Sequence, residues 1–269
     1  MPELTIVLPA YNEAARIGPA LDELFGYLRR RGGPPREGNP ESGNLPEGIR
    51  VLVVDDGSSD ATAEIVRARP EARPEVRDAG AAGPWKGAWL DLLAVPHGGK
   101  GAAVKAGILA ADGELIVFAD ADMATPPDQL PLLVAALEMA DVALGSRIQT
   151  DGSDMRRTQP GVRRLLGKAF HLLASAWVAG PVRDTQCGFK GFRAVAARDL
   201  FSRQVVTSIV FDVELIFLAR RRGYRIAVVP IQWTDRRGSR MQARPGLAVR
   251  VAWDLFRIPL IHRDVSRAR

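Results

Sequence analysis

Two aspartates two positions apart, Asp120 and Asp122, follow a run of apolar residues in the stretch VFADADMATPPDQL. Paired carboxylates at this spacing suit a divalent cation, because Mg²⁺ and Mn²⁺ prefer oxygen ligands. A solvated turn would equally account for an isolated pair of this kind. The other polar clusters of the chain decide between these two interpretations.

Four polar clusters each follow an apolar run that is typical of a buried strand. In an open α/β sheet, ligands bind beyond the carboxyl ends of the strands. Any one cluster could be loop chemistry or a helix cap, and Asp56 is a good capping residue for the helix expected next. Four clusters at one edge predict a binding site. They are Ala10-Tyr11-Asn12-Glu13, Asp55-Asp56-Gly57-Ser58, His97-Gly98-Gly99-Lys100-Gly101 and Asp120-Ala121-Asp122.

The Gly-Gly-Lys-Gly loop around Lys100 precedes an expected helix, so it offers backbone N–H groups, a helix N-terminus and an ammonium to a phosphate. It is not the P-loop of nucleoside triphosphatases, because Gly101 stands where Ser or Thr is needed. No G-x-G-x-x-G follows the first strand, which argues against a dinucleotide-dependent dehydrogenase. A basic loop facing a carboxylate pair suits a metal-bound diphosphate instead.

These clusters lie in an alternation of β-rich and helical runs. The strands are continuous apolar runs, as in a parallel sheet that is covered on both faces. The alternation therefore predicts a doubly wound, mostly parallel α/β layer with helices on both faces. Strands are expected at 4–9, 50–55, 91–96, 114–120 and 141–147, with helices at 14–31, 59–68, 100–111 and 127–139.

Two segments interrupt the alternation and are interpreted as surface insertions. Residues 32–48 are rich in Gly, Pro and polar side chains, and residues 69–89 carry Trp85 and Trp89, which we expect to pack back on the domain. The second half adds a polar loop and the run DTQCGFKGFR. It also predicts a helix at 160–178, another at 211–223, a strand within 224–234 and a basic C-terminal helix.

Composition limits the class of protein. The 269 residues are 46% hydrophobic, enough for one sizeable core, and the net charge of +6 favours anionic partners. Nucleic acid is not expected, because no aromatic and basic recognition motif is present. The single cysteine excludes an internal disulfide and fits a reducing compartment. The sequence enters a strand pattern at once and lacks an apolar run of about 18 residues, so neither a signal peptide nor a spanning helix is expected.

Several motifs together carry a resemblance to a known family. VLPAYNE, VVDDGSSDAT, GGKGAAVKAG, the D-A-D triplet and GSR, in this order and spacing, resemble family 2 glycosyltransferases with the GT-A fold. RDTQCGFKGF, FDVELIFLARRRGYRI and a W-T-D-x-x-G-S-R run resemble the dolichyl-phosphate glucosyltransferases and polyprenyl-phosphate glycosyltransferases within it. The resemblance covers nearly the whole chain outside the two insertions. We therefore expect a GT-A catalytic domain over 1–234 and a basic amphipathic segment over 235–269.

The resemblance also implies a donor site. Asp120 and Asp122 would bind Mg²⁺ or Mn²⁺ with the donor diphosphate, and Lys100 would lie near the donor. Relatives of the mannosyl type often carry Gln as a further metal contact where Ala124 stands here, which favours UDP-glucose over GDP-mannose. The other residues expected around the nucleotide and the donor are Pro9, Ala10, Tyr11, Glu13, Asp55, Asp56 and Ala121.

The residues expected around the acceptor depend on whether the nucleophile is a hydroxyl or a phosphate. A hydroxyl must lose a proton as it attacks and needs a general base, whereas a lipid monophosphate, with a second pKa of about 6, mainly needs orienting. Arg147 is the main candidate for holding such a phosphate. Asp184 could orient the acceptor or act as base, and Asp212 begins a helix where acidic residues are favourable anyway. Further candidate cations, for which a solvated helix face is an equal interpretation, are Arg163, Arg164, Lys168 and Arg240.

The sequence thus predicts an inverting, metal-dependent transferase that moves glucose from UDP-glucose to a polyprenyl phosphate. Alternatives are use of GDP-mannose, transfer to a soluble hydroxyl acceptor, and a silent nucleotide-sugar-binding protein, against which the intact D-A-D triplet speaks. Cys187 and the three histidines show no metal-ligand spacing and are assigned structural roles. We expect a cytoplasmic protein, peripheral at the inner face of the cell membrane. The C-terminal run around Trp253 and Phe256 would either lie in an anionic interface or close the core.

Overall fold

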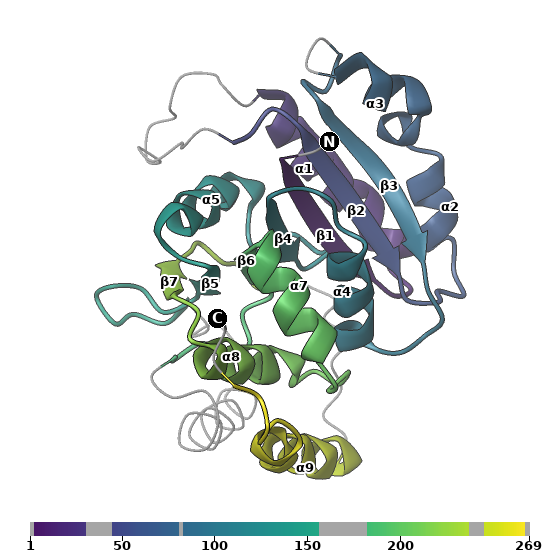
Figure 1. Cartoon of the computed structure of the whole chain (residues 1–269). Coiled ribbons are helices and arrows are strands. Elements are labelled where there is room, and N and C mark those ends of the chain that lie inside the picture. The colour runs from purple at the N-terminus through teal and green to yellow at the C-terminus, as the bar shows by residue number, and fades with distance from the viewer. Residues whose placement is uncertain (1–2, 31–44, 81–82, 156–181, 237–244, 267–269) are drawn as a thin grey trace.

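The computed structural model describes residues 3–30, 45–80, 83–155, 182–236 and 245–266, without the side chains of 245–250. A seven-stranded sheet in the order β3-β2-β1-β4-β6-β5-β7 runs through its centre (Figure 1). Only β6 runs antiparallel to its neighbours, β4 and β5. The mostly parallel α/β fold is therefore confirmed. The strands are β1 (Leu4–Ala10), β2 (Ile49–Asp55), β3 (Ala88–Ala94), β4 (Leu115–Ala119), β5 (Val142–Ser146), β6 (Phe189–Arg193) and β7 (Ile226–Pro230).

Helices cover both faces of the sheet and enclose two cores (Figure 1). One core lies under α1 (Ala14–Arg30), α2 (Thr62–Arg67) and α5 (Leu130–Met139). The other lies under α4 (Lys100–Leu109), α7 (Ala194–Arg203) and α8 (Phe211–Arg222), with α9 (Pro245–Ile261) packed outside on α8. Successive side chains of a strand point to opposite faces, so continuous apolar strands supply both cores.

The first half follows the predicted alternation closely, with one shift. β3 begins at Ala88 rather than at residue 91, because Ala88 to Leu90 pair with the start of β2. Trp89 therefore belongs to the sheet and not to an insertion, whereas Trp85 packs edge-on against Phe25 with ring centroids 5.7 Å apart. The rest of that predicted insertion contains the short helices η1 (Pro70–Ala72) and α3 (Pro74–Ala79), and η3 (Pro127–Gln129) leads into α5. Most of the first predicted insertion lies outside the described residues.

The second half contains two elements that the sequence pattern did not reveal. β6 lies between β4 and β5, and α7 follows it directly. Phe189 and Phe192 of β6 are fully buried on opposite faces of the sheet. The predicted helices and strand at α8, β7 and α9 are confirmed, and the helix predicted at 160–178 lies outside the described residues. Within the described part of the chain, none of the helices has the length and apolar character needed to cross a bilayer.

Candidate functional site

The loops after β1 and β2 are bonded to each other at the carboxyl edge of the sheet. The N–H of Asp56 donates to the carbonyl of Ala10 at 2.9 Å. Asn12 accepts from the N–H of Ser59 at 2.8 Å, and its own N–H donates to the hydroxyl of Ser58 at 2.8 Å. Asn12 adopts a φ of 54°, a left-handed conformation that Asn tolerates better than most residues. Two of the predicted clusters therefore form one rigid edge.

Asp56 joins this edge to the glycine loop after β3. Its two carboxylate oxygens accept the N–H groups of Gly98 and Gly99 at 2.8 and 3.0 Å. The Asp56 side chain is buried, so these bonds fix the loop that leads into α4. The alternative of Asp56 as a cap for the next helix, α2, is wrong. The neighbouring Asp55 is also buried and accepts from the N–H of Ser58 at 3.2 Å.

An aromatic pair lies beside this loop. The rings of Tyr11 and His97 stack with centroids 4.2 Å apart and planes 24° apart. His97 is also held by Asp56, with 2.9 Å between its ring Nδ1 and the carboxylate. The His97 side chain is 55% exposed, so its ring is accessible beside the glycine loop. Together the two rings offer a flat surface at the edge of the site.

The remaining residues predicted around the nucleotide lie close to this edge. Pro9 is part of β1 and is only partly buried. The N–H of Glu13 donates to the hydroxyl of Thr62 at 2.7 Å, and its carboxylate forms an ion pair with Arg16 at the start of α1. Ala10 and Ala121 are buried.

The carboxylate pair after β4 faces the lysine that opens α4. The Nζ of Lys100 lies 2.5 Å from the Oδ1 of Asp120. Burial disfavours the ammonium, but attraction to Asp120, Asp212 and Asp122 outweighs it and raises the pKa of Lys100. Burial and the charge of Asp120 raise the pKa of Asp122, against the stabilising hydrogen bond from the N–H of Ala124. Asp120 and Asp122 thus form a pair of like charges that Lys100 only partly neutralises.

Gly188, before β6, sets the position of Asp120. Its carbonyl accepts the N–H of Asp120 at 3.0 Å. A Cβ at this position would lie 2.2 Å from the Oδ2 of Asp120, so any side chain would displace the carboxylate. The QCGFK motif therefore contributes to the same site as the D-A-D triplet.

A buried ion pair lies next to these groups. The sequence predicted one of its members, Asp212, but not the other, Lys190. The Nζ of Lys190 donates to Asp212 at 2.7 Å and to the carbonyl of Cys187 at 2.5 Å, and it lies 5.4 Å from the ring centre of Phe118. Lys190 is fully buried. Burial raises the pKa of Asp212, against the attraction of Lys190 and Lys100. The run Phe-Lys-Gly-Phe is the signal that could have identified Lys190. Successive side chains of a strand point to opposite faces, so a lysine between apolar residues of a buried strand has to face a core.

Arg147 and Asp184, both predicted at the site, are bonded to each other. The Nε, Nη2 and backbone N–H of Arg147 donate to the Asp184 carboxylate at 2.8, 2.6 and 2.8 Å. The guanidinium also lies 5.6 Å from the ring centre of Trp233. Burial opposes the charge of Arg147, but the bonds to Asp184 prevail and raise its pKa. Burial, followed by the charge of Asp184, raises the pKa of Cys187 to about 12, so this thiol is a poor nucleophile.

The donor set of Asp120 and Asp122 fits a divalent cation. Both supply carboxylate oxygens, and the repulsion that raises the pKa of Asp122 is what a cation would relieve. In the described ranges, no third His, Cys, Asp or Glu joins them in a metal-binding group. The further candidate cations, Arg163, Arg164, Lys168 and Arg240, lie outside the described residues.

Comparisons with known proteins find relatives by sequence and by fold. The family model described as glycosyl transferase family 2 matches residues 5–201. The chain is 38% identical to a dolichyl-phosphate beta-glucosyltransferase of Trichomonas vaginalis, over 96% of this chain and 71% of that protein. It is 35% identical to that of Drosophila melanogaster and 33% identical to that of Homo sapiens, each over 89% of this chain and 69% of the relative.

Two solved structures share the fold at low sequence identity. One is glucosyl-3-phosphoglycerate synthase from Mycobacterium tuberculosis in complex with Mn²⁺, UDP-glucose and phosphoglyceric acid. It has a TM-score of 0.61 and 20% identity over 96% of this chain and 79% of that one. The other is Staphylococcus aureus TarS in complex with UDP-GlcNAc, with a TM-score of 0.55 and 19% identity over 97% and 67%. These likenesses concern the fold alone.

Proposed function

This chain belongs to glycosyl transferase family 2, and from that premise we propose that it transfers glucose from UDP-glucose to a polyprenyl phosphate. The relatives named as dolichyl-phosphate beta-glucosyltransferases support this acceptor class. The UDP-glucose complex of a protein with the same fold supports the donor. We further propose that the reaction takes place at the cytoplasmic face of a membrane, where such an acceptor lies.

The main observation behind the proposal is that the two candidate general bases, Asp184 and Asp212, are each paired with a cation. Asp184 accepts three hydrogen bonds from Arg147, and Asp212 is bonded to the buried Lys190. Each carboxylate is engaged by its cation, so the bonded oxygens are not free to take a proton from an acceptor hydroxyl, although burial raises the pKa of Asp212. A hydroxyl acceptor needs a base, whereas a phosphate monoester is already largely ionised at neutral pH. The paired carboxylates therefore favour a phosphate nucleophile.

The loops after β1 to β3 are suited to the nucleotide. The stacked rings of Tyr11 and His97 offer a surface for the base. Asp55, buried beside them, would accept from the base or the ribose, and Pro9, Ala10 and Glu13 form the adjoining wall. Asp56 acts on the donor indirectly, because its oxygens hold the glycine loop.

Asp120 and Asp122 would hold Mg²⁺ or Mn²⁺, with Ala121 between them. When bound, the cation would neutralise the charge that develops on the departing diphosphate. Lys100 adds an ammonium at the N-terminus of α4, where the helix dipole also favours phosphate. Its raised pKa keeps it charged through the neutral range.

Arg147 would orient the acceptor phosphate, and Asp184 would fix the plane of its guanidinium. An oxygen of the lipid phosphate forms the bond to the anomeric carbon as the bond from that carbon to the UDP oxygen breaks. UDP leaves on the opposite side, so the anomeric configuration is inverted. No proton has to be removed from the nucleophile, which agrees with the paired state of Asp184 and Asp212.

The test is a transfer assay with purified protein and Mg²⁺ or Mn²⁺. Radiolabelled UDP-glucose and GDP-mannose are supplied separately, with and without a polyprenyl phosphate, and label in the organic phase is counted. We expect label from UDP-glucose only, dependent on the lipid and lost in Asp122→Ala. Label from GDP-mannose would overturn the donor assignment. Donor binding without label in the lipid would overturn the acceptor assignment, and binding of neither donor would overturn the proposed activity.

A further inference from the structure

Helix α9 has one buried face and one exposed apolar face. Leu255, Ile258 and His262 are buried against the rest of the molecule. The opposite face carries large apolar side chains that are exposed: Trp253 (61%), Phe256 (50%), Leu260 (55%) and Ile261 (41%). We call these four residues the outer face of α9. Its inner side closes the core, so the outer face needs a separate explanation.

The outer face is compact and its aromatic residues are in contact. The rings of Trp253 and Phe256 are stacked with centroids 6.2 Å apart. Exposed Trp and Phe on one side of a helix are typical of helices that lie in the interfacial region of a bilayer.

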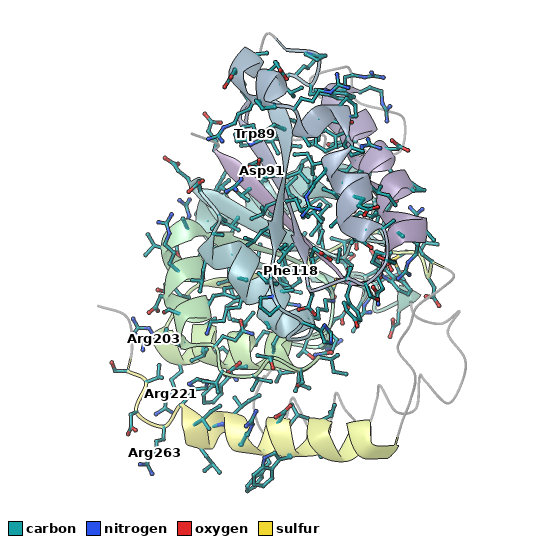
Figure 2. The ribbon with its side chains drawn as sticks, turned by 90° about the vertical axis from the view of Figure 1, so that its right-hand side faces the viewer. Trp89, Asp91, Phe118, Arg203, Arg221 and Arg263 are labelled. Atoms are coloured by element: carbon teal, nitrogen blue, oxygen red, sulfur yellow. The ribbon has the colours of Figure 1, made fainter. Side chains whose placement is uncertain are left out.

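Two arginines lie near the C-terminal end of α9 (Figure 2). Figure 2 shows Arg221, from the end of α8, and Arg263 near the same end of α9. Arg221 donates to the carbonyls of Val265 and Arg263 at 2.8 and 2.5 Å, which ties α8 to the segment after α9. The side chain of Arg263 is 80% exposed and lies 3.4 Å from that of Asp264. Arg263 thus supplies an exposed cation two residues beyond Ile261, and a cation close to an apolar helix face suits anionic lipid headgroups.

One short segment connects α9 to the candidate active site. Ser208 donates to Asp254 of α9 at 2.6 Å. One residue earlier, the carbonyl of Thr207 accepts the N–H of Gly101 at 3.0 Å, in the loop that carries Lys100. The helix with the outer face and the loop suited to the donor diphosphate are thus held by adjacent residues.

We propose that the outer face of α9 docks on an anionic lipid bilayer. This inference rests on the proposed function in one respect, since a polyprenyl phosphate would be presented from such a surface. Four side chains of this size, each about half exposed, present roughly 400 Å², whereas a stable protein interface buries about 800 Å² per partner. A bilayer is the better match, because a single helix face suffices to enter the headgroup boundary.

The test is flotation of the purified chain with vesicles of phosphatidylcholine and phosphatidylglycerol that contain no polyprenyl phosphate. We expect the protein to float, and the double variant Trp253→Ser/Phe256→Ser to lose at least about tenfold in partitioning. The matched control is Met139→Ser/Val195→Ser, which removes two more exposed apolar side chains, on α5 and α7. It should partition within about twofold of the unaltered protein, and UDP-glucose binding and thermal melting should be the same in all three proteins.

Two other outcomes of the flotation and light-scattering experiments overturn the inference. Equal loss in both double variants would mean that the outer face has no special part. A dimer in light scattering that becomes a monomer in the α9 variant, without flotation of the unaltered protein, would assign the face to a second copy. Because the vesicles lack an acceptor, failure here leaves the proposed transferase activity standing. Flotation without transfer to lipid would instead retain the docking surface and remove the proposed function.

Discussion

The two halves of the candidate site hold their carboxylates in different ways. In the nucleotide edge, formed by Tyr11, Asp55, Asp56 and His97 after β1 to β3, both aspartates accept backbone N–H groups. In the charge cluster, formed by Lys100, Asp120, Asp122, Lys190 and Asp212, side chains pair mainly with one another. The first half is a set of loops shaped by hydrogen bonds. The second is a balance of opposite charges, which is buried at Lys190 and Asp212 and partly exposed at Lys100 and Asp120.

Because the two halves hold their carboxylates differently, mutations in the nucleotide edge and in the charge cluster should have different effects. A lost side chain in the nucleotide edge changes the shape or surface presented to the donor, so donor affinity should respond first. A lost charge in the cluster leaves its partner unpaired, so stability, turnover or both should respond. The following four variants test that division, in order of expected effect.

Asp122→Asn should reduce transfer by at least about a thousandfold, because loss of a metal ligand removes several kcal/mol of transition-state stabilisation. The variant should nevertheless melt at a higher temperature without metal or donor, since the charged form of Asp122 is disfavoured in the folded protein. A raised pKa means that this cost is absent below the ordinary pKa of a carboxyl, grows as pH rises from that value to the raised one, and stays constant above it. The difference in melting temperature should therefore grow with pH.

Thermal melts of both proteins between acidic and neutral pH check this sign. Asp112→Asn, which alters a largely exposed carboxylate, is the control and should show no such growth. A stability difference that shrinks as the pH rises would contradict the account of Asp122.

Lys190→Met should destabilise the fold by about 3–5 kcal/mol, because Asp212 would remain buried without its cation. The double variant Lys190→Met/Asp212→Leu should recover much of this loss, since neither charge is then left unpaired. Urea denaturation measures both. Arg225→Met, which breaks an exposed ion pair with Asp141, should cost less than about 1 kcal/mol. A double variant no more stable than the single one would show that the pair itself is not the cause.

Gly188→Ala should lower the turnover number by about a hundredfold, because the new Cβ displaces the Asp120 carboxylate. The KM for UDP-glucose should change much less if the nucleotide edge supplies most of the donor affinity. Steady-state kinetics separate the two constants. Gly18→Ala is the matched control, since a Cβ there meets only Ile65 at 3.9 Å. Equal kinetics for both variants would exclude a tightly held position for Asp120.

His97→Ala should weaken UDP-glucose binding by about two- to tenfold, which corresponds to loss of a stacking partner worth about 0.5–1.5 kcal/mol. His97→Phe keeps an aromatic ring against Tyr11 and should retain most of the affinity. Calorimetric titration with UDP-glucose compares the two. If both variants bind as the unaltered protein does, the ring pair takes no part in donor binding.

The same two halves differ in how far the sequence predicted them. The alternation of apolar strands and helices, with polar clusters at strand ends, correctly predicted β1, β2 and β4 and brought Asp56, Lys100 and Asp120 to one edge. The true partner of Asp56 was missed, because Gly98 and Gly99 lie about forty residues further on and capping rules describe only neighbours. The roles of these residues in catalysis remain predictions.

The charge cluster was harder to predict for a physical reason. β6 is short, contains Gly191 and carries a buried lysine, so it lacks the continuous apolar run of a central strand. The ion pairs of Asp184 and Asp212 also join positions far apart in the chain, and nothing local in either motif reveals a bonded carboxylate. Sequence patterns therefore identified these two residues without their partners.

The most direct test of the account is to supply UDP-glucose with a polyprenyl phosphate and with the corresponding polyprenol, under identical conditions. The paired state of Asp184 and Asp212 predicts glucose transfer to the phosphate and none to the free alcohol, because the site offers no unpaired base at either residue. Transfer to the polyprenol at a comparable rate would contradict the account, since it would require a carboxylate of the site to accept the proton of the alcohol.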